Sequence, residues 1–315
     1  QRVENPVRQM NFGDYLEHCV DVLKAENRYG YARNLDELRA SILHFRKTLN
    51  FYFSDIDLRW LRGYELYLRG RGNKANTIGI RMRALRMLYN RAIADKVVKR
   101  DNYPFNDFKV SEFHEQTMKR AISKEDIKRI IDLDLRTVTT CHSPCLSLGR
   151  DLFLFSYLSC GINLTDMARV RYCDIFEGRL PYHRQKTGKL ISFLLQPMAL
   201  DIIEKYRKPD AAPNDYVFPI LDRKINKTEV QKRDRIHKVM KATNRALRRI
   251  GEVLDIPIDL TTYVARHSYA TVLKRSGVST AIISESLGHS SEKVTQIYLD
   301  SFENSQIDEA MKNLL

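Results

Sequence analysis

Apolar residues recur at three- and four-residue spacing through residues 10–100, and this spacing predicts amphipathic helices. The first two apolar stripes are formed by Phe12, Tyr15, Leu16, Cys19, Val20 and Leu23, and by Leu38, Ile42, Phe45 and Leu49. Asp55 and Asp57 begin a third helix, and Asn76 or Thr77 can cap a fourth. We therefore expect the first part of the chain to be a compact bundle of four or five helices.

The apolar pattern becomes irregular after Asn102 and turns helical again at Ser123, a good N-cap residue that is followed by two acids. A loss of periodicity between two helical regions is typical of a linker between domains. We predict a helical domain, a linker, a second domain and a C-terminal tail helix at residues 1–107, 108–120, 121–302 and 303–315.

The second domain mixes helical spacing with short strand-like segments. Helical periodicity covers residues 148–159, 164–170, 230–250 and 269–276. Strands are predicted at residues 172–176, 180–186 and 190–195, separated by the turn sequences Glu177-Gly178 and Thr187-Gly188. The expected fold class is mainly α with a small antiparallel β-sheet, and the sheet belongs to the second domain.

The chain is strongly basic, because 53 lysines and arginines outnumber 39 acidic residues and give a net charge of +14. Such an excess suits a polyanionic partner such as nucleic acid, although some basic proteins have none. Ten basic residues and a single acid, Asp95, lie between Arg69 and Arg100. A solvated helix face usually mixes both signs, so this segment favours phosphate contact. The candidate DNA-binding residues are Arg69, Arg71, Lys74, Arg81, Arg83 and Arg86.

The five cysteines form an odd set without a small secreted framework, which is typical of reduced thiols in an intracellular protein. The spacing of Cys141, His142 and Cys145 resembles that of zinc ligands. No second pair of Cys or His residues follows at the spacing that a zinc site needs, so we assign no metal. The sequence also contains no apolar run long enough to span a bilayer, and a soluble protein is expected. The first residue is Gln1 rather than methionine, which leaves room for a further N-terminal module.

The last part of the chain carries an arginine, a histidine and a tyrosine on helical sequence, at Arg266, His289 and Tyr298. Together they can open a phosphodiester: the arginine spreads charge over non-bridging oxygens, the histidine donates a hydrogen bond, and the tyrosine oxygen attacks. A single tyrosine on an amphipathic helix is more often a packed aromatic residue. The three residues in this order make DNA strand exchange the leading hypothesis.

The segments Arg266-His-Ser-Tyr-Ala-Thr, Leu287-Gly-His289 and Tyr298 resemble the C-terminal boxes of tyrosine recombinases of the phage and conjugative-element integrase family. The resemblance covers essentially all 315 residues. It implies a helical core-binding domain followed by a catalytic domain, with Tyr298 forming a 3′-phosphotyrosine while a 5′-hydroxyl leaves. It also implies that the protein is a monomer when free and a homo-tetramer on double-stranded DNA, and that it uses no cofactor.

Lys186, in the sequence Gln185-Lys-Thr-Gly-Lys, matches the lysine that this family places in a strand-to-strand hairpin. The resemblance implies that Lys186 enters the minor groove and protonates the leaving 5′-oxygen, a task that suits a compact ammonium group. Solvated lysines are common in turns, so the motif by itself leaves that alternative open.

The sequence departs from the family at Asn163, which stands where the family usually has its first catalytic arginine. Two cations normally grip the phosphate, so either another arginine substitutes or cleavage is slow. We expect Arg184 to substitute, because it lies two residues before Lys186 and residues at that spacing on a strand share a face. Arg169 and Arg171 are rivals. The alternative is that Arg184 is a surface strand residue that touches nothing.

A second departure is Tyr263, where the family commonly has histidine or lysine. A phenol can donate a hydrogen bond to phosphate but carries protons poorly at neutral pH, so Tyr263 is expected to be a phosphate contact. His267 and Asp166 are expected to orient the pocket, unless they are simply buried polar groups with satisfied hydrogen bonds.

Three functions fit these features. The first is a site-specific recombinase that integrates and excises a mobile element or inverts a DNA segment. The second is a non-catalytic DNA-binding relative that lost cleavage together with the arginine at position 163, and the third is a type IB topoisomerase. The absence of the first arginine and the motif Tyr263-x-x-Arg-His-Ser resemble features of integrases of the Bacteroidetes group.

The resemblance carries further expectations about partners and location. It implies a bacterial, cytoplasmic, nucleoid-associated protein, with an accessory DNA-bending or excision factor as a further partner. In this family the tail typically docks into a neighbouring protomer, and packing of the tail on its own domain is the alternative. The apolar stripe of the tail consists of Ile307, Met311, Leu314 and Leu315.

Overall fold

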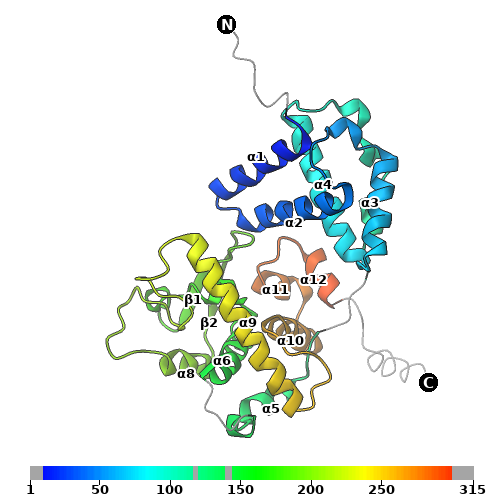
Figure 1. Ribbon diagram of the computed structural model, residues 1–315. Coiled ribbons are helices and arrows are strands. Elements are labelled where there is room, and N and C mark those ends of the chain that lie inside the picture. The colour runs from blue at the N-terminus through cyan, green and yellow to red at the C-terminus, as the bar shows by residue number, and fades with distance from the viewer. Residues whose placement is uncertain (1–9, 116–119, 139–143, 300–315) are drawn as a thin grey trace, which may run out of the picture. The chain divides into compact units, whose positions relative to one another are not determined.

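The computed structural model describes residues 10–115, 120–138 and 144–299. The chain divides into two compact units, Gln1–Thr117 and Met118–Leu315 (Figure 1). Each unit contains its own hydrophobic core. The two units are described separately below.

Four α-helices form residues 10–115 of the first unit, together with short 3₁₀ turns. They are α1 (Phe12–Ala25), α2 (Tyr29–Arg46), α3 (Leu58–Gly70) and α4 (Ala75–Ala94). Helix α4 contacts the other three, and α1 also packs along α2. The apolar stripe predicted for the first helix is confirmed, because all six of its residues are buried. Aromatic rings fill much of this core, including Phe12 and Phe51, whose rings are stacked with centroids 4.7 Å apart.

Two of the four helices begin with a side-chain cap, from Asn11 at α1 and from Asp57 at α3. Asp57 caps α3, because its side chain accepts a hydrogen bond of 2.6 Å from the Trp60 amide, and the predicted start is confirmed. The prediction that Asn76 or Thr77 caps the next helix is wrong, since α4 begins at Ala75. The side chain of Asn76 instead exchanges two hydrogen bonds with the backbone of Glu115 and holds the end of this unit against α4.

Residues that the sequence placed at the start of the linker pack into the first unit. Phe108, Val110 and Phe113 are buried in its core. The chain passes so close to α4 that a Cβ added at Gly79 would lie 2.7 Å from the Phe113 carbonyl oxygen. The contact therefore requires glycine at position 79.

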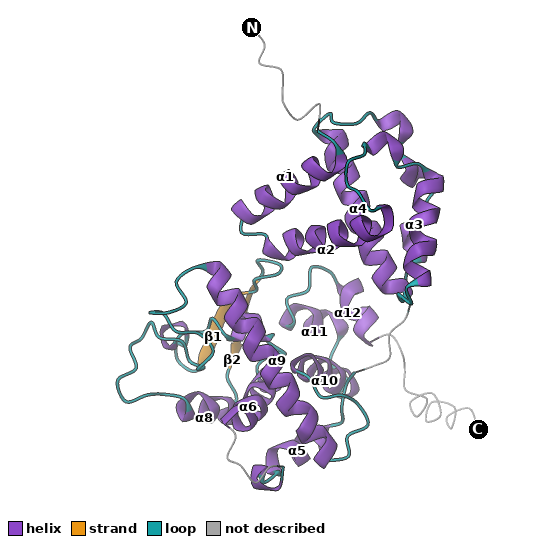
Figure 2. Ribbon diagram, in the orientation of Figure 1, coloured by secondary structure: helices purple, strands orange, loops and turns teal. Residues whose placement is uncertain are grey.

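Eight α-helices and one β-hairpin form the described part of the second unit (Figure 2). The helices are α5 (Lys124–Asp132), α6 (Pro144–Leu158), α7 (Leu164–Met167), α8 (Pro197–Lys205), α9 (Glu229–Val253), α10 (Thr262–Arg275), α11 (Thr280–Ser286) and α12 (Glu292–Leu299). Helix α6 lies at the centre and packs against α8, α9 and α10. The predicted N-cap at Ser123 is confirmed, because its side chain accepts a hydrogen bond from the Asp126 amide.

The sheet has two antiparallel strands, β1 (Arg179–His183) and β2 (Leu190–Leu194), which pair Arg179 with Leu194 and His183 with Leu190. The prediction of a further strand at residues 172–176 is wrong. Tyr172–Asp174 forms a 3₁₀ turn, because the Asp174 carboxylate accepts the Arg171 amide hydrogen and closes the turn. The fold class expected from the sequence, mainly helical with a small antiparallel sheet, is confirmed.

Within the described ranges, no helix is both long and apolar enough to cross a bilayer, and no group of three or more His, Cys, Asp or Glu side chains could hold a metal ion. Cys141 and His142 lie outside the described residues, as does the tail predicted at residues 303–315.

Candidate active site

Arg266 joins three segments that are far apart in the sequence. It lies in α10 and is only 2% exposed. Its Nη1 donates to the Gly161 carbonyl oxygen at 2.7 Å, and its Nη2 donates to the Leu287 carbonyl oxygen at 2.5 Å and to His289 Nε2 at 3.2 Å. A buried guanidinium requires such acceptors, because burying its charge without hydrogen bonds is costly.

Two glycines allow this close packing. Gly161 has a φ of +63°, and a Cβ added there would lie 2.9 Å from the Arg266 side chain. Gly288 has a φ of +61°, and a Cβ there would lie 2.5 Å from Ile191 Cδ1 of β2. Both positions combine a left-handed backbone with a close approach, so each favours glycine strongly.

Arg184 reaches the same segment from the hairpin. It follows β1, is 7% exposed, and its Nη1 donates to the Gly288 carbonyl oxygen at 2.7 Å. Thr187 Oγ1 donates to the same oxygen at 3.2 Å. Arg184 is therefore not a surface residue without contacts, and that alternative is excluded. Arg184 and Arg266 donate hydrogen bonds to the carbonyl oxygens of two consecutive residues, Gly288 and Leu287.

The two rival arginines are held elsewhere. The guanidinium of Arg169 donates to both carboxylate oxygens of Glu229, at 3.3 Å and 2.8 Å, and that of Arg171 forms a salt bridge of 3.1 Å with Asp174. Arg184 forms no salt bridge with any described residue. Of the three arginines considered, it is the one that meets Arg266 at the Leu287–His289 segment.

His289 lies between these cations and helix α12. It is 6% exposed, and its Nδ1 lies 2.7 Å from the hydroxyl oxygen of Thr295. Burial lowers the pKa of His289 to about 4, and the positive charges of Arg266, Arg184 and the hairpin lysines add to this effect. The imidazole is therefore neutral at pH 7.

Asn163 and Asp166 support the pocket from α7. Asn163 is the N-cap of this helix, where its side chain accepts from two backbone amides, and its Nδ2 donates to Asp166 Oδ2 at 2.7 Å. The other carboxylate oxygen of Asp166 accepts the Gln185 amide hydrogen at 2.9 Å, which attaches the hairpin turn to α7. Burial raises the pKa of the Asp166 carboxyl, although both of these hydrogen bonds oppose the change.

The remaining predicted residues lie at the rim or outside the described side chains. Lys186 is exposed in the turn between β1 and β2, and Tyr263 is 44% exposed with its ring 4.5 Å from that of His267 in an edge-to-face contact. Burial, assisted by Arg120 and Arg266, lowers the pKa of His267 to about 4.

Tyr298 lies in the last turn of α12, and its side chain is outside the described part of the structure. The backbone of α12 packs against α10 and α11 of the same chain. The residue predicted as nucleophile therefore lies on a helix that contacts the helix of Arg266.

The sequence interpretation missed two threonines. Thr187 donates a hydrogen bond to the Gly288 carbonyl oxygen, and Thr295 contacts the His289 ring. A signal was available for the second, because Thr295 precedes Tyr298 by three residues and so falls on the same face of a helix. No comparable signal marks Thr187, whose contact depends on the position of a distant loop.

The basic segment of the first unit is more varied than its composition indicated. Arg81 is largely buried and forms a salt bridge of 2.9 Å with Glu37 of α2. Arg69 pairs with Glu65, and Arg71 donates to the Tyr67 hydroxyl at 3.0 Å. Of the six candidate DNA-binding residues, Lys74, Arg83 and Arg86 are exposed and have neither a salt bridge nor a side-chain hydrogen bond to a described residue.

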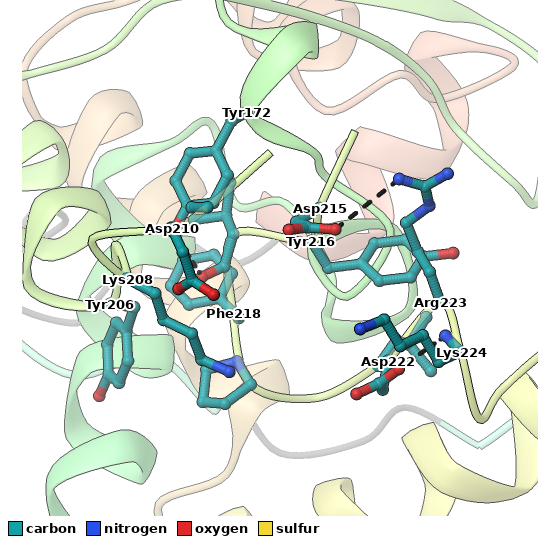
Figure 3. A pocket seen from close by; sticks show the side chains of 14 residues that line it. Tyr172, Tyr206, Lys208, Asp210, Asp215, Tyr216, Phe218, Asp222, Arg223 and Lys224 are labelled. Atoms are coloured by element: carbon teal, nitrogen blue, oxygen red, sulfur yellow. Dashed lines mark hydrogen bonds and ion pairs between the residues drawn. The ribbon is translucent and has the colours of Figure 1, made fainter. Parts of the chain in front are cut away.

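A separate cavity of about 220 Å³ lies in the second unit (Figure 3). Its lining includes Tyr172, Tyr206 and Phe218, together with an Arg223–Asp215 ion pair of 3.7 Å. None of its lining residues belongs to the network around Arg266. The cavity is therefore distinct from the candidate active site.

Comparisons with known proteins agree with this architecture. Residues 11–110 match the phage integrase SAM-like domain, and residues 120–305 match the phage integrase family. Tyrosine recombinase XerC of Roseiflexus castenholzii is 22% identical over 90% of this chain and 86% of its own length. Tyrosine recombinase XerA of Pyrococcus furiosus is 25% identical, and the match spans 58% of both proteins.

Two solved structures share the fold. The Tn1549 transposon integrase in complex with a circular intermediate DNA superposes with a TM-score of 0.64 at 13% identity, over 97% of this chain and 100% of that one. A lambda integrase dimer bound to a COC′ core site gives 0.59 at 14% identity, over 93% and 78%. The family match covers more than half of the sequence and includes Arg266, His289 and Tyr298, and the chain therefore belongs to the phage integrase family of tyrosine recombinases.

Proposed function

We propose that the protein is a site-specific DNA recombinase that cuts and rejoins DNA through a 3′-phosphotyrosine at Tyr298. The observation that carries this proposal is the convergence of two buried guanidinium groups, Arg266 and Arg184, and a neutral imidazole, His289, on the segment that directly precedes α12. Perturbed, buried ionisable groups that gather from distant segments are typical of catalytic sites.

The proposed reaction is an exchange of one phosphodiester for another. The oxygen of Tyr298 attacks phosphorus, the bond to the 5′-oxygen breaks, and the phenolic proton is lost to solvent. Arg266 and Arg184 stabilise the charge that develops on the non-bridging oxygens, and Lys186 protonates the leaving 5′-oxygen. Because the new phosphotyrosine ester conserves the energy of the broken phosphodiester bond, a 5′-hydroxyl from another strand can attack it without an energy source and release the tyrosine.

Tyr263 and His289 supply hydrogen bonds to the phosphate in this scheme. Asp166, Asn163 and His267 act indirectly, since they hold the hairpin turn and the helices around the pocket. Asn163 is an N-cap rather than a phosphate ligand, which supports the assignment of its missing charge to Arg184.

The partner is double-stranded DNA. The exposed cations Lys74, Arg83 and Arg86 are proposed to contact phosphates, with Arg69 and Arg71 adding charge at the adjoining helix end. Strand exchange needs two duplexes and hence four active sites, so a homo-tetramer on DNA is proposed, with a monomer as the free form. One similar fold is a lambda integrase tetramer bound to a Holliday junction, which supports this assembly.

The cellular role follows from strand exchange at fixed sites: integration and excision of a mobile element, or inversion of a DNA segment, in the cytoplasm at the nucleoid. An accessory DNA-bending or excision factor would set the direction of exchange. The charge of +14 supports association with DNA.

The test is trapping of a covalent adduct. Duplexes would be selected by binding from a randomised pool and then nicked near the cleavage site, so that the released fragment diffuses away. The wild-type protein should form an adduct that survives denaturing gel electrophoresis. Tyr298→Phe should bind the same duplex with similar affinity and form none, because it lacks the attacking oxygen.

Tyr31→Phe is a matched control, since it removes a phenol from an exposed position of the first unit and should leave the adduct at wild-type level. An adduct in Tyr298→Phe would refute the assigned nucleophile. Tight, sequence-selective binding by a wild-type protein that forms no adduct would favour the non-catalytic alternative.

A further inference from the structure

Thr295 has no role in the scheme above, yet its hydroxyl makes a contact with the active-site histidine. The side chain is fully buried in α12, and its Oγ1 lies 2.7 Å from His289 Nδ1. On the opposite side of the same ring, Nε2 lies 3.2 Å from Arg266 Nη2. One imidazole thus bridges the arginine of α10 and the threonine of α12.

These contacts determine where the ring carries its proton in the DNA-free protein. A guanidinium nitrogen can only donate, so Nε2 of His289 must accept from Arg266. A neutral imidazole then has its hydrogen on Nδ1, which donates to the Thr295 hydroxyl oxygen. The lowered pKa of His289 is consistent with a ring that holds a single proton.

The proposed reaction requires the other arrangement. To donate a hydrogen bond to the phosphate from Nε2, His289 must carry its proton there, and Nδ1 must become an acceptor. A threonine hydroxyl serves both states, because it accepts from Nδ1–H in one and rotates to donate to Nδ1 in the other. The ring holds one proton before and after the change, since Nε2 takes up a proton from solvent as Nδ1 releases one to solvent.

We propose that Thr295 is a positioning residue that supports both tautomers of His289 and so lets the ring pass from Arg266 to the scissile phosphate when DNA binds. This inference rests on the proposed function. The same bond attaches His289 to the helix of Tyr298, which lies about one turn further along α12, so the histidine and the nucleophile are positioned together.

The surroundings of Thr295 indicate that the hydroxyl serves the ring. Helix α12 packs against α10 and α11, which contribute Ala270 and Ile283 to an apolar cluster, and valine has nearly the same shape as threonine. A buried hydroxyl without a partner lowers stability, so an apolar residue would be favoured here if His289 needed nothing from this position.

The experiment compares Thr295→Val, which keeps the shape and loses the hydroxyl, with Thr295→Ser, which keeps the hydroxyl. Thr243→Val is the matched control, because it removes a buried threonine hydroxyl from α9 of the same unit. Each full-length protein is assayed for the rate of adduct formation on the nicked duplex and for DNA affinity. The tautomer of His289 is read from long-range ¹H–¹⁵N spectra, with the signal assigned through a His289→Gln variant.

Thr295→Val should slow adduct formation by about 10- to 100-fold, by analogy with the loss of hydrogen-bond partners of metal-ligating histidines, with unchanged DNA affinity. Thr295→Ser and Thr243→Val should stay within about threefold of wild type. In the DNA-free wild type the proton should be on Nδ1, and DNA should move it to Nε2. Thr295→Val should fail to show this shift.

Wild-type rates in Thr295→Val, or equal losses in Thr295→Ser and Thr295→Val, would overturn the proposal, since the second result would indicate packing alone. A proton on Nε2 in the DNA-free wild type would also overturn it. This last measurement needs no cleavage, so it remains decisive if the wild-type protein forms no adduct and the proposed function itself fails.

Discussion

Arg184 and Arg266 show how two cations from distant elements meet at one segment of the chain. Both guanidinium groups are buried, and they donate to the adjacent carbonyls of Gly288 and Leu287. The sequence placed Arg266, His289 and Arg184 among the candidates because their types and spacing matched phosphate chemistry. Thr295 was not among them, although it shares a helix face with Tyr298, because its contact with His289 depends on the tertiary structure.

Replacing Arg184 should separate cleavage from binding. Arg184→Ala removes a cation that faces the developing charge, so adduct formation should fall by about 100-fold or more, while the affinity for the duplex changes little. Arg169→Ala is the matched control, because it removes a guanidinium that pairs with Glu229. Adduct formation would be followed by denaturing gels; equal rates for Arg184→Ala and wild type would show that Arg184 does not substitute for the missing arginine.

The two histidines with lowered pKa values should make stability depend on pH. His267 and His289 titrate at about 4 in the folded state, against an ordinary value of 6.5. Between these values the unfolded chain binds more protons, so the free energy of unfolding should rise as pH increases from about 4 to 6.5 and then level off. Urea unfolding at several pH values measures this.

His267→Gln should remove part of this slope, because one of the two titrating groups is gone. A flat profile from pH 5 to pH 7 in the wild-type protein would contradict neutral, buried histidines. A fall in stability with rising pH over that range would mean that at least one of them is held protonated in the folded protein.

At the scale of elements, helices were predictable and short segments were not. The long apolar stripes of α1 and α9 are enough to predict a helix and its buried face. Residues 172–176 form a segment too short for periodicity to distinguish a strand from a turn. This segment forms a 3₁₀ turn, which is closed by the hydrogen bond from the Arg171 amide to the Asp174 carboxylate. The end of the first unit is also hard to read from the sequence, because Phe108 and Phe113 look like loop residues but are buried in its core.

We expect the arginines of helix α4 to differ in function, with Arg83 and Arg86 binding DNA and Arg81 stabilising the fold. Arg83→Ala and Arg86→Ala should each weaken DNA binding and reduce the slope of log affinity against log salt by about one, because each removes an exposed cation. Arg81→Ala should leave the slope unchanged and lower the melting temperature, since it breaks the salt bridge with Glu37 of α2. Fluorescence anisotropy at several salt concentrations distinguishes the two classes; equal slopes for all three variants would contradict the division.

At the scale of the whole molecule, the chain consists of two units with separate cores. Each core contains enough buried aliphatic and aromatic residues for independent stability. Residues 1–117 and 118–315, produced separately, should each show one cooperative thermal transition by circular dichroism. A fragment that unfolds gradually would show that its core depends on the other unit.

The positive charge is also a property of the whole molecule. With a net charge of +14, the intact protein should lose about 10³- to 10⁵-fold in DNA affinity between 50 and 200 mM salt if it contacts six to ten phosphates. Either unit alone should show a shallower dependence. An affinity that is insensitive to salt would indicate that phosphate contacts contribute little.

The oxygens that hold the two guanidinium groups, at residues 161, 287 and 288, all belong to the main chain. No point mutation can delete a peptide carbonyl, so these anchors persist through side-chain variation elsewhere in the protein. Laboratory evolution toward new target sequences could therefore alter the groove-facing surfaces extensively and leave the cleavage chemistry intact, provided that the two glycines at 161 and 288 are kept.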